Sequence, residues 1–477
     1  MLDLLGTLGA LALLVALAWR GVNLILLSAL CAGLAALVAG APVPATLTQV
    51  YMPAAAAFIA DYFLLFLLGA VFGRLMDETG AAEALAVAVV RRVGEARAVA
   101  AVTAACAALT YGGVSLFVVA FAMFPVATAL FRAADAPRRL IPASIALGAF
   151  TFTMTAAPGT PAIQNAIPMP YFETTLFAAP GLGLLAAAIM AGFGLGWLGW
   201  RVRSLRARGE GWNDEGRDGA SASRAAAARS GSTTRAGARA GPSDRPSARV
   251  ALAAVLIVLI GNLVLSTQVM PRLDAAYLAE PRWGGTRLQA VAGLWSILGA
   301  LTLAILFLLA ALGRRLTAPL ASLGAGADAS ALPIFNTACL VGFGAVVAGL
   351  PAFAQVQGAI EGVGGGPLVS LAISTSVLAG LTGSASGGMR IALDALGADY
   401  AAMAAAGQVS AEALHRVAAI ATGGLDALPH NGAVVTLLSL CGLSHRQSYP
   451  DIFMVAVAGP LLALAAVLIV AAGTGAS

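Results

Sequence analysis

Long apolar stretches of roughly 20 residues follow one another along most of this chain, separated by short polar or basic segments. An α-helix of about 20 apolar residues is long enough to cross the hydrocarbon core of a bilayer. Hydrophobic residues make up 60% of the 477 residues and charged residues only 10%, whereas a soluble domain typically has about 25% charged residues. A soluble enzyme would leave this much apolar surface without a polar shell. The pattern therefore predicts an all-α polytopic membrane protein.

One segment interrupts the apolar pattern. Residues 201–249 are rich in Ser, Gly, Ala and Arg and contain almost no large apolar side chains. Such a composition buries too little surface to fold, so we expect a disordered linker between two membrane halves, 1–200 and 250–477. The linker holds 11 arginines against 5 acidic residues, a net charge of +6, while the whole chain carries +5. The basic character belongs to the linker and does not indicate a nucleic-acid partner.

Arginines at the ends of the apolar stretches indicate the orientation of the chain. Cytoplasmic loops carry an excess of basic residues. We therefore expect these ends in the cytoplasm, together with the linker: Arg20, Arg91, Arg92, Arg97, Arg132, Arg138, Arg139, Arg314 and Arg315. The uncharged segment 41–53 is expected as a loop on the other side, and both termini in the periplasm. Abundant alanine and arginine without lysine suggest a GC-rich bacterial genome, hence a bacterial inner membrane. The first apolar run lacks a basic leader, so no cleavable signal peptide is expected.

The arginines also require one segment to return to the side from which it starts. Residues 98–131 begin and end beside cytoplasmic arginines, which a single crossing cannot achieve. Two short arms around "TYGGVS" can do so as a re-entrant hairpin, provided that the tip is buried in protein or lines a cavity. We predict such hairpins at about 98–131 and 366–398.

The second half resembles the first in three segments that occur in the same order. Residues 67–86 resemble 342–361, residues 107–125 resemble 379–397, and "RRLIPASIALGAFTFTMTAAPG" resembles "LHRVAAIATGGLDALPHNG". We count five crossings and one hairpin in each half. An odd number of crossings makes the second half enter from the opposite face, so two inverted-topology repeats are predicted.

Each half also contains an apolar helix that is interrupted by prolines and glycines, at about 140–168 and 415–444. The interruptions are "TMTAAPGTPAIQN" (153–165) and "GGLDALPHNGAVV" (423–435). Proline removes a backbone donor and clashes with the preceding turn, so the helix unwinds. Unwound carbonyls bind cations and fresh helix N-termini bind anions, and transporters with inverted repeats place such breaks around the substrate. The alternative is that prolines only kink the helices and small residues only help them pack.

The tips of the two hairpins supply further polar groups. "LTYGGVS" (109–115) and "LTGSASGG" (381–388) combine glycines, which let the backbone approach a ligand closely, with hydroxyl groups that donate and accept hydrogen bonds. We expect the two tips and the two breaks to converge on one site.

Charged residues inside apolar stretches are costly and usually functional. Asp61 is one. Arg390 and Asp394 lie four residues apart on an expected helix, so they can pair with each other, or Arg390 can meet a substrate carboxylate. Asp426 is the first candidate for proton coupling, because burial favours the neutral form of a carboxyl group. His430 is the second, since imidazole titrates near physiological pH, although a hydrogen bond to a neighbouring helix would also explain it.

Other polar and sulfur-containing residues receive simpler interpretations. His415 and His445 each precede an arginine near the end of a span, so we expect them at the membrane interface. The four cysteines stand alone in apolar surroundings and are interpreted as small packing residues. No nucleotide-binding loop or metal-ligand spacing occurs, so transport would use an ion gradient.

Three segments resemble the gluconate permease family of bacterial carboxylate symporters, within the wider ion-transporter superfamily: 150–183, "SGGMRIALDAL" (386–396) and "LDALPHNGAVVTLL" (425–438). The resemblance is closest to the 3-hydroxybutyrate permease branch. It implies a proton symporter of small hydroxylated monocarboxylates with inverted repeats and two re-entrant hairpins. It also implies that Thr155, Gly159, Thr160, Gln164 and Asn165 lie in the first break, that Ser384, Ser386, Gly387 and Gly388 line the second tip, and that His430 and Asn431 lie in the second break.

We therefore predict an importer and not an enzyme, without metal or cofactor, driven by H⁺ or alternatively by Na⁺ held by backbone carbonyls. A channel and a membrane enzyme are the alternatives from other classes. The expected partners are a small organic anion and the bilayer, with a homodimer left open. The predicted ion-coupling residues are Asp426, His430 and Asp394. The predicted substrate-binding residues are Thr110, Gly112, Gly113, Ser115, Thr155, Gly159, Thr160, Gln164, Asn165, Thr382, Ser384, Ser386, Gly387, Gly388, Arg390 and Asn431.

Overall fold

The computed structural model of the protein describes residues 9–10, 12–14, 16–17, 23–93, 97–114, 116–212, 246–350, 366–382, 384–429 and 431–473. Within these ranges the regular secondary structure is helical, and seven helices are long and apolar enough to cross a membrane. These features confirm the predicted all-α polytopic class. Ser115, His430 and most of the predicted linker (213–245) lie outside the described residues. The inverted relation of the two halves stays a prediction.

The first half contains a capped helix followed by one long span. Helix α2 (Leu24–Val38) begins after Asn23, whose side-chain oxygen accepts a hydrogen bond from the N–H of Ile25 at 3.0 Å. The next span runs continuously through α3 (Val43–Thr46), the π-helical turn η1 (Leu47–Tyr51) and α4 (Met52–Glu78). The loop predicted over 41–53 is therefore wrong from residue 43 onward. Proline is tolerated in a first helical turn, where its missing N–H would have no partner, and this is where Pro44 lies.

A helical pair follows α5 (Ala81–Val93). It consists of α6 (Ala98–Tyr111) and α7 (Leu116–Ala133). The turn between them contains Gly113, whose φ of 89° lies in the region that glycine adopts without steric cost.

The next helix of the first half is interrupted. Its parts are α8 (Ile141–Ala149), the π-helical turn η4 (Phe152–Ala156), α9 (Ile163–Ala166) and α10 (Pro168–Phe172), and α11 (Pro180–Ala207) completes the half. Helix α11 continues past the predicted start of the linker at residue 201. Leu205 is buried there and Arg201 forms an ion pair with Asp451, so tertiary contacts support the helix that composition alone did not indicate.

The second half contains a similar order of elements. They are α13 (Ala248–Val264), α14 (Leu288–Leu312), α15 (Pro319–Gly349), α17 (Pro367–Thr382), α18 (Ala385–Ala405), α19 (Ala411–Thr422), the 3₁₀ turn η11 (Leu425–Ala427), α20 (Gly432–Cys441), α21 (His445–Phe453), the π-helical turn η12 (Met454–Ala458) and α22 (Gly459–Gly473). Short helical turns over 265–283 connect α13 with α14.

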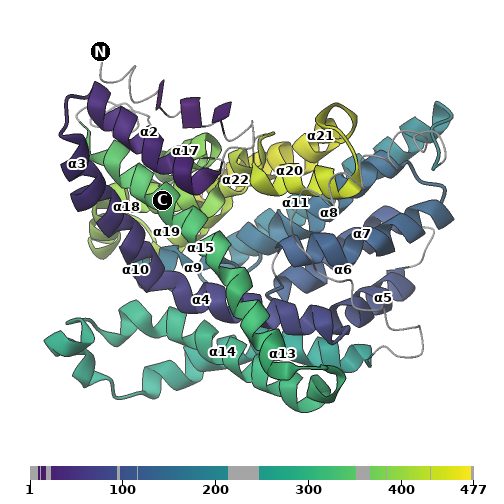
Figure 1. Ribbon diagram of the computed structural model, residues 1–477, viewed down its shortest axis with the longest axis horizontal. Helices are drawn as coiled ribbons and strands as arrows, with labels where there is room; N and C mark the ends of the chain where they lie inside the picture. Colours follow the sequence, from purple (N-terminus) through teal and green to yellow (C-terminus); the bar gives the residue numbers. More distant parts are fainter. Residues whose placement is uncertain are drawn as a thin grey trace.

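The two halves are interleaved and do not form separate bodies. Helices α4 and α15 lie side by side across the centre (Figure 1). They run antiparallel, because Gly342 lies against Tyr51 while Gly326 lies against Val71. Helix α2 packs on α15, and α13 packs on α5. The first helices of each half thus cover elements of the other half.

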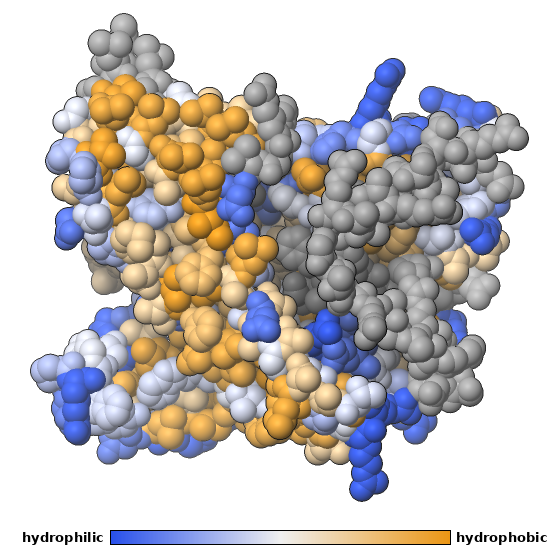
Figure 2. All heavy atoms as spheres, viewed as in Figure 1, coloured by the Kyte–Doolittle hydropathy of each residue, from blue (hydrophilic) through white to orange (hydrophobic). Residues whose placement is uncertain are grey.

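Apolar side chains cover the outer faces of several helices. Figure 2 shows them gathered over α2 and along the crossing of α4 and α15. The exposed residues there include Leu26, Leu30, Leu34 and Leu37 of α2, Phe63 and Leu64 of α4, and Leu332 and Phe335 of α15. A surface of this kind suits lipid contact. All four cysteines are buried, which confirms their interpretation as packing residues.

Candidate functional site

The first interruption is an extended segment between two helical pieces. Helix α8 and its π-helical turn end at Ala156, and Ala157 already has an extended backbone (φ −63°, ψ 124°). Helix α9 begins only at Ile163. Within this gap Gly159 has a φ of 80°, and a Cβ atom there would overlap the ring of Phe177. Only glycine fits both the backbone conformation and the space.

The second interruption separates α19 from α20. Helix α19 ends at Thr422, the short turn η11 contains Asp426, and Leu428 is extended. Asn431 then begins α20, since its side-chain oxygen accepts hydrogen bonds from the N–H groups of Ala433 (2.6 Å) and Val434 (3.1 Å). The predicted binding residue Asn431 therefore caps a helix in this structure.

The two interruptions touch each other. A Cβ atom on Gly423 would lie 2.7 Å from the hydroxyl oxygen of Thr155. The hydroxyl of Thr155 donates to the carbonyl of Thr151 at 3.2 Å. The two breaks, which lie more than 250 residues apart in the sequence, thus form one region of the core.

Each helical pair reaches the interruption of its own half. In the first half, the hydroxyl of Tyr111 donates to the carbonyl of Pro158 at 2.6 Å. In the second half, the hydroxyl of Ser376 on α17 donates at 2.8 Å to the carbonyl of Ala421, in the last turn of α19 just before the interruption. A Cβ atom on Gly380 would lie 2.8 Å from Leu425. The contacts run from the first pair through both breaks to the second pair.

Asn165 is the hydrogen-bonding centre of the first break. Its amide nitrogen donates to the carbonyls of Thr160 (3.0 Å) and Leu176 (2.9 Å). Its side-chain oxygen accepts from His415 (3.0 Å) and Arg416 (3.0 Å) of α19. Asn165 is completely buried, so this predicted binding residue joins the two halves and has both of its polar atoms engaged.

The same network assigns the tautomer of His415. The oxygen of Asn165 can only accept, so Nε2 of His415 donates to it. Nδ1, 2.6 Å from the hydroxyl of Thr174, then accepts from that hydroxyl. His415 is completely buried in the protein. The expectation that it lies at the membrane interface is wrong, because the α10–α11 connection covers it.

Arg416 is also completely buried, and its guanidinium uses all five N–H groups. Besides Asn165, it donates to the carbonyls of Ala156 (3.3 Å), Leu176 (3.1 Å) and Ala178 (3.0 and 2.8 Å). These carbonyls belong to the end of η4 and to the α10–α11 connection. Arg416 therefore holds the first break in its unwound shape. An arginine within the apolar helix α19 was a signal for a functional residue, but its position beside an expected span end concealed it.

Among the described residues of this region, four buried oxygens have no hydrogen-bond partner. They are the hydroxyls of Thr110, Thr160 and Thr375 and Oδ1 of Asp426. They come from α6, the first break, α17 and η11 respectively. An unpaired buried polar group costs about 1–3 kcal/mol, so these atoms retain hydrogen-bonding capacity at a cost in stability. Thr375 was not among the predicted residues.

Several predicted glycines lie at close contacts between helices. A Cβ atom on Gly388 would overlap the backbone of Ala379, and one on Gly112 would lie 2.5 Å from Val255. At Gly387 the nearest atoms would be 3.2–3.3 Å away. These contacts fit the packing interpretation of the glycines.

The remaining predicted residues of these segments are buried or serve as caps. Ser384 caps α18 by accepting from the N–H of Gly387 at 3.2 Å. Gln164 and Ser386 are buried. The side chain of Thr382 lies outside the described residues.

Arg390 forms a second charged cluster, between α18, α4 and α10. It pairs with Asp394 at 2.9 Å and with Asp61 at 3.0 Å. Its guanidinium lies over the rings of Tyr62 and Tyr171, and the hydroxyl of Tyr171 donates to Asp394. The structure thus joins Arg390 to the predicted coupling residue Asp394 and to Asp61, so its charge is already matched by carboxylates.

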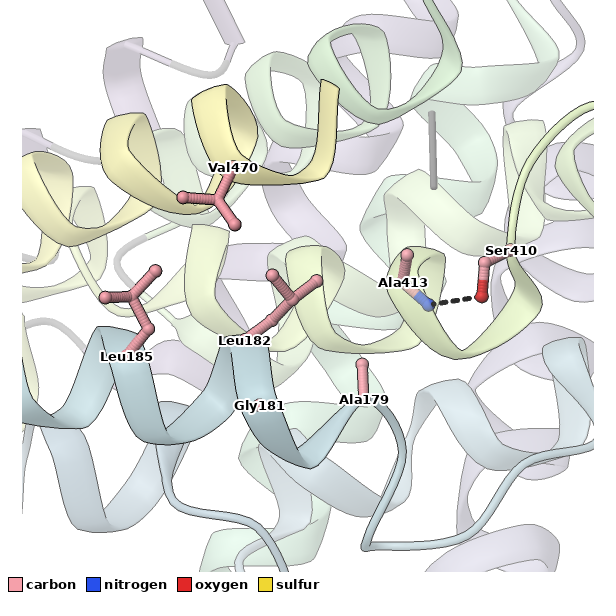
Figure 3. Close-up of a pocket in the computed structure, with 7 residues that line it drawn as sticks. All are labelled: Ala179, Gly181, Leu182, Leu185, Ser410, Ala413 and Val470. Carbon is pink, nitrogen blue, oxygen red and sulfur yellow. Dashed lines mark hydrogen bonds between the residues drawn. The ribbon is translucent and has the colours of Figure 1, made fainter. Parts of the chain in front are cut away.

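A pocket of about 350 Å³ opens elsewhere, between α11, α22 and the start of α19 (Figure 3). Its walls are mostly apolar and are formed by Ala179, Gly181, Leu182, Leu185, Ser410, Ala413 and Val470. None of these residues belongs to the predicted site. Among the described lining residues the polar side chain is that of Ser410, which already accepts a hydrogen bond from the N–H of Ala413 at 3.3 Å. This pocket therefore offers little for recognising a polar ligand.

The helical fold and the two interrupted helices in its core define a polytopic membrane protein with a buried polar region. No protein-family model matches the chain. The chain is 40% identical over 462 residues to the "Uncharacterized transporter YxjC" of Bacillus subtilis (strain 168), which covers 95% of this chain and 96% of the relative. The chain belongs to the family of this transporter.

Proposed function

We propose that the protein is a secondary active transporter that imports a small hydroxylated monocarboxylate together with a proton, by alternating access. The observation that carries this proposal is the contact of the two helix interruptions, Thr155 against Gly423, with a helical pair adjoining each. Interrupted helices that meet inside a membrane protein are the usual location of substrate and coupling ions in transporters. The membership in a transporter family supports the same class.

The proposed substrate site lies between the breaks and the tips of the helical pairs. Thr110, Thr160 and Thr375 offer unpaired hydroxyls, and Asp426 offers an unpaired carboxylate oxygen for the coupling proton. The two membrane halves are proposed to be inverted repeats, with the helical pairs re-entering the membrane. Asn165 and Arg390 act in this proposal as structural partners of other residues, because their polar groups are engaged.

The substrate class rests on the resemblance of 150–183, 386–396 and 425–438 to gluconate permeases. Gluconate carries five hydroxyls and would need many polar partners. The unpaired groups here are few and short, so we favour the smaller 3-hydroxybutyrate. Sodium is the alternative coupling ion, since unwound carbonyls and hydroxyls bind it without a titratable group.

We place the linker on the cytoplasmic side of a bacterial inner membrane. Arg139 pairs with Glu210 at 3.3 Å, and Arg206 donates to the carbonyl of Ala134. The basic residues that precede α8 and the last, basic turn of α11 therefore lie together at one end of the molecule. This supports a common side for them, and the positive-inside rule makes that side cytoplasmic.

Uptake into proteoliposomes tests this function. Labelled 3-hydroxybutyrate and gluconate are offered with an imposed pH gradient in sodium-free buffer. We expect saturable accumulation of 3-hydroxybutyrate that collapses when the proton gradient is dissipated. Uptake that requires sodium would move the coupling to Na⁺. Unsaturable uptake that follows only the electrical gradient would indicate a channel and contradict the proposal.

A further inference from the structure

The described core of the transporter contains a positive charge that forms no ion pair. Arg416 is completely buried, and its five N–H groups all donate to neutral oxygens. Among the ion pairs of the described ranges, none includes Arg416. Glu412, one turn earlier on α19, acts on Arg416 only through longer-range electrostatics, because its carboxylate is exposed and accepts a hydrogen bond from the N–H of Ala179.

The other buried ionic groups of the described core differ from Arg416. Asp451 is paired with Arg201 at 2.7 Å. Arg390 is paired with two carboxylates. Within the described ranges Asp426 is a buried acid that, like Arg416, has no ion pair, and it lies ten residues further along the same interrupted helix. A buried charge is strongly unfavourable until another charge balances it.

We infer that Arg416 is the fixed counter-charge for the carboxylate of the substrate, which is held beside it by the hydroxyls of Thr160 and Thr110. The inference rests on the proposed function and names the anion-binding part of that site. Thr160 is joined to Arg416 through Asn165, which donates to the Thr160 carbonyl at 3.0 Å. The hydroxyl of Thr160 is completely buried and unpaired.

Thr110 reaches the same place from the first helical pair. It precedes Tyr111, whose hydroxyl donates to the carbonyl of Pro158 in the first break. The next turn places Gly113 against Pro161, because a Cβ atom on this glycine would lie 3.1 Å from the proline ring. Thr110 and Thr160 thus present two unpaired hydroxyls on adjoining segments, and hydroxyls donate well to a carboxylate.

In this proposal Arg416 acts on the substrate through the electrostatic field of its guanidinium and through its hydrogen bond to Asn165. It does not touch the substrate, so it is a positioning residue. Its donors are all in use, so direct contact with the substrate would require the first break to change shape. Charge is balanced in both states of the cycle. In the proposed cycle Asp426 is deprotonated in the empty protein, so that one buried negative charge accompanies the positive charge of Arg416. In the loaded protein Asp426 carries the proton and the substrate carboxylate supplies the negative charge.

This alternation links anion binding to proton uptake without direct contact between the two. The groups near Asp426 do not replace it in this role. Helix α17 and the turn η12, which pack on η11, carry no charged residue. Tyr449 of α21 donates to the carbonyl of Ala427 at 3.2 Å, and His445 contacts the carbonyl of Pro429.

Calorimetric binding in detergent tests the inference without relying on transport. The probes are 3-hydroxybutyrate and its neutral amide, titrated in buffers of different ionisation enthalpy to count protons. For the wild-type protein we expect the carboxylate to bind at least tenfold more tightly than the amide, with uptake of about one proton. Arg416→Gln should lose this preference, whereas Arg416→Lys should keep it with weaker binding overall. Asp426→Asn should bind the carboxylate without proton uptake.

The control is Arg446→Gln, which changes the arginine of the other His-Arg pair in the chain. Arg446 is exposed, so this variant should bind like the wild type. If Arg416→Gln does not fold, the Arg416→Lys variant provides the test. A folded lysine variant that does not prefer the carboxylate over the amide would contradict a role of the positive charge at this position. An unchanged preference in Arg416→Gln overturns the inference and leaves the proposed function intact. A wild-type protein that binds neither probe overturns the proposed substrate class together with the inference.

Discussion

Arg416 donates a hydrogen bond to the side-chain oxygen of Asn165, 3.0 Å away, although 251 residues separate them in the chain. Asn165 lies in the interruption of the first half and Arg416 on the helix that leads to the interruption of the second. The contact therefore joins the two proposed halves of the substrate site. If the two interruptions move relative to each other, the hydrogen bond between Arg416 and Asn165 breaks unless both residues move together.

Asn165→Asp should destabilise the protein although it places a carboxylate beside Arg416. The substitution replaces an N–H₂ group by an oxygen that faces the carbonyls of Thr160 and Leu176. We expect a loss of about 2–4 kcal/mol, since two buried acceptors lose their donor. The thermal unfolding midpoint in detergent measures this. Asn23→Asp is the control, because Asn23 uses only its oxygen as a helix cap. Equal midpoints for both variants would contradict the assigned role of the Asn165 amide.

Thr174→Val should also lower the unfolding midpoint. The hydroxyl of Thr174 donates to Nδ1 of His415 at 2.6 Å in the buried network, so valine leaves a buried acceptor without a partner at a cost of about 1–3 kcal/mol. Thr302→Val serves as control, because the Thr302 hydroxyl only bonds its own helix on an exposed face. A midpoint for Thr174→Val as high as that of the control would mean that His415 finds its donor elsewhere.

Gly388→Ala should separate the second helical pair. An added Cβ atom overlaps the backbone of Ala379 in α17, and backbone cannot move away as a side chain can. We expect a loss of stability of about 1–3 kcal/mol or more, accompanied by loss of uptake. Gly432→Ala, in the second interruption, meets nothing within 4 Å and should leave the midpoint unchanged. A tolerated alanine at position 388 would show that α17 and α18 are not tightly packed there.

Asp451→Asn should remove the charge that balances Arg201 in a buried pair. Arg201 donates to the two carboxylate oxygens of Asp451 at 2.7 and 3.1 Å, and Trp197 adds a bond at 3.0 Å. Breaking a buried pair by changing one partner costs roughly 3–5 kcal/mol. Asp399→Asn, on an exposed position of α18, is the matched control. Unfolding curves of the two variants that coincide would contradict a stabilising role of the pair between α11 and α21.

Asp426→Asn should abolish proton-driven accumulation while leaving substrate exchange intact. The asparagine cannot carry a proton across, but it preserves the size of the side chain. Counterflow of labelled 3-hydroxybutyrate in proteoliposomes separates the two processes, with Asp328→Asn as an exposed control. Normal accumulation by Asp426→Asn would exclude Asp426 as the coupling group and leave the proton to another residue.

The sequence by itself determined the class of the protein and the places where its helices stop. Apolar length is a local property, so the all-α membrane class follows directly from it. The interruption after Ala156 is equally local, because Pro158 and Pro161 remove backbone donors and Gly159 adopts a conformation closed to other residues. The sequence did not predict the helical start at Val43 or the extension of α11 to Ala207, because both are stabilised by contacts with neighbouring elements.

Only the tertiary structure decided which residues meet across the interruptions. His415 and Arg416 looked interfacial from their position beside a span end, yet both are completely buried against Asn165. Arg390 was expected either to pair with Asp394 or to meet a substrate carboxylate; the structure shows the pair with Asp394 and adds Asp61 from the other half, which the sequence did not indicate. Hydrophobic periodicity reports whether a residue faces apolar surroundings, and it contains no information on which distant segment provides them. Partners across two interleaved halves therefore depend on packing that no local pattern encodes.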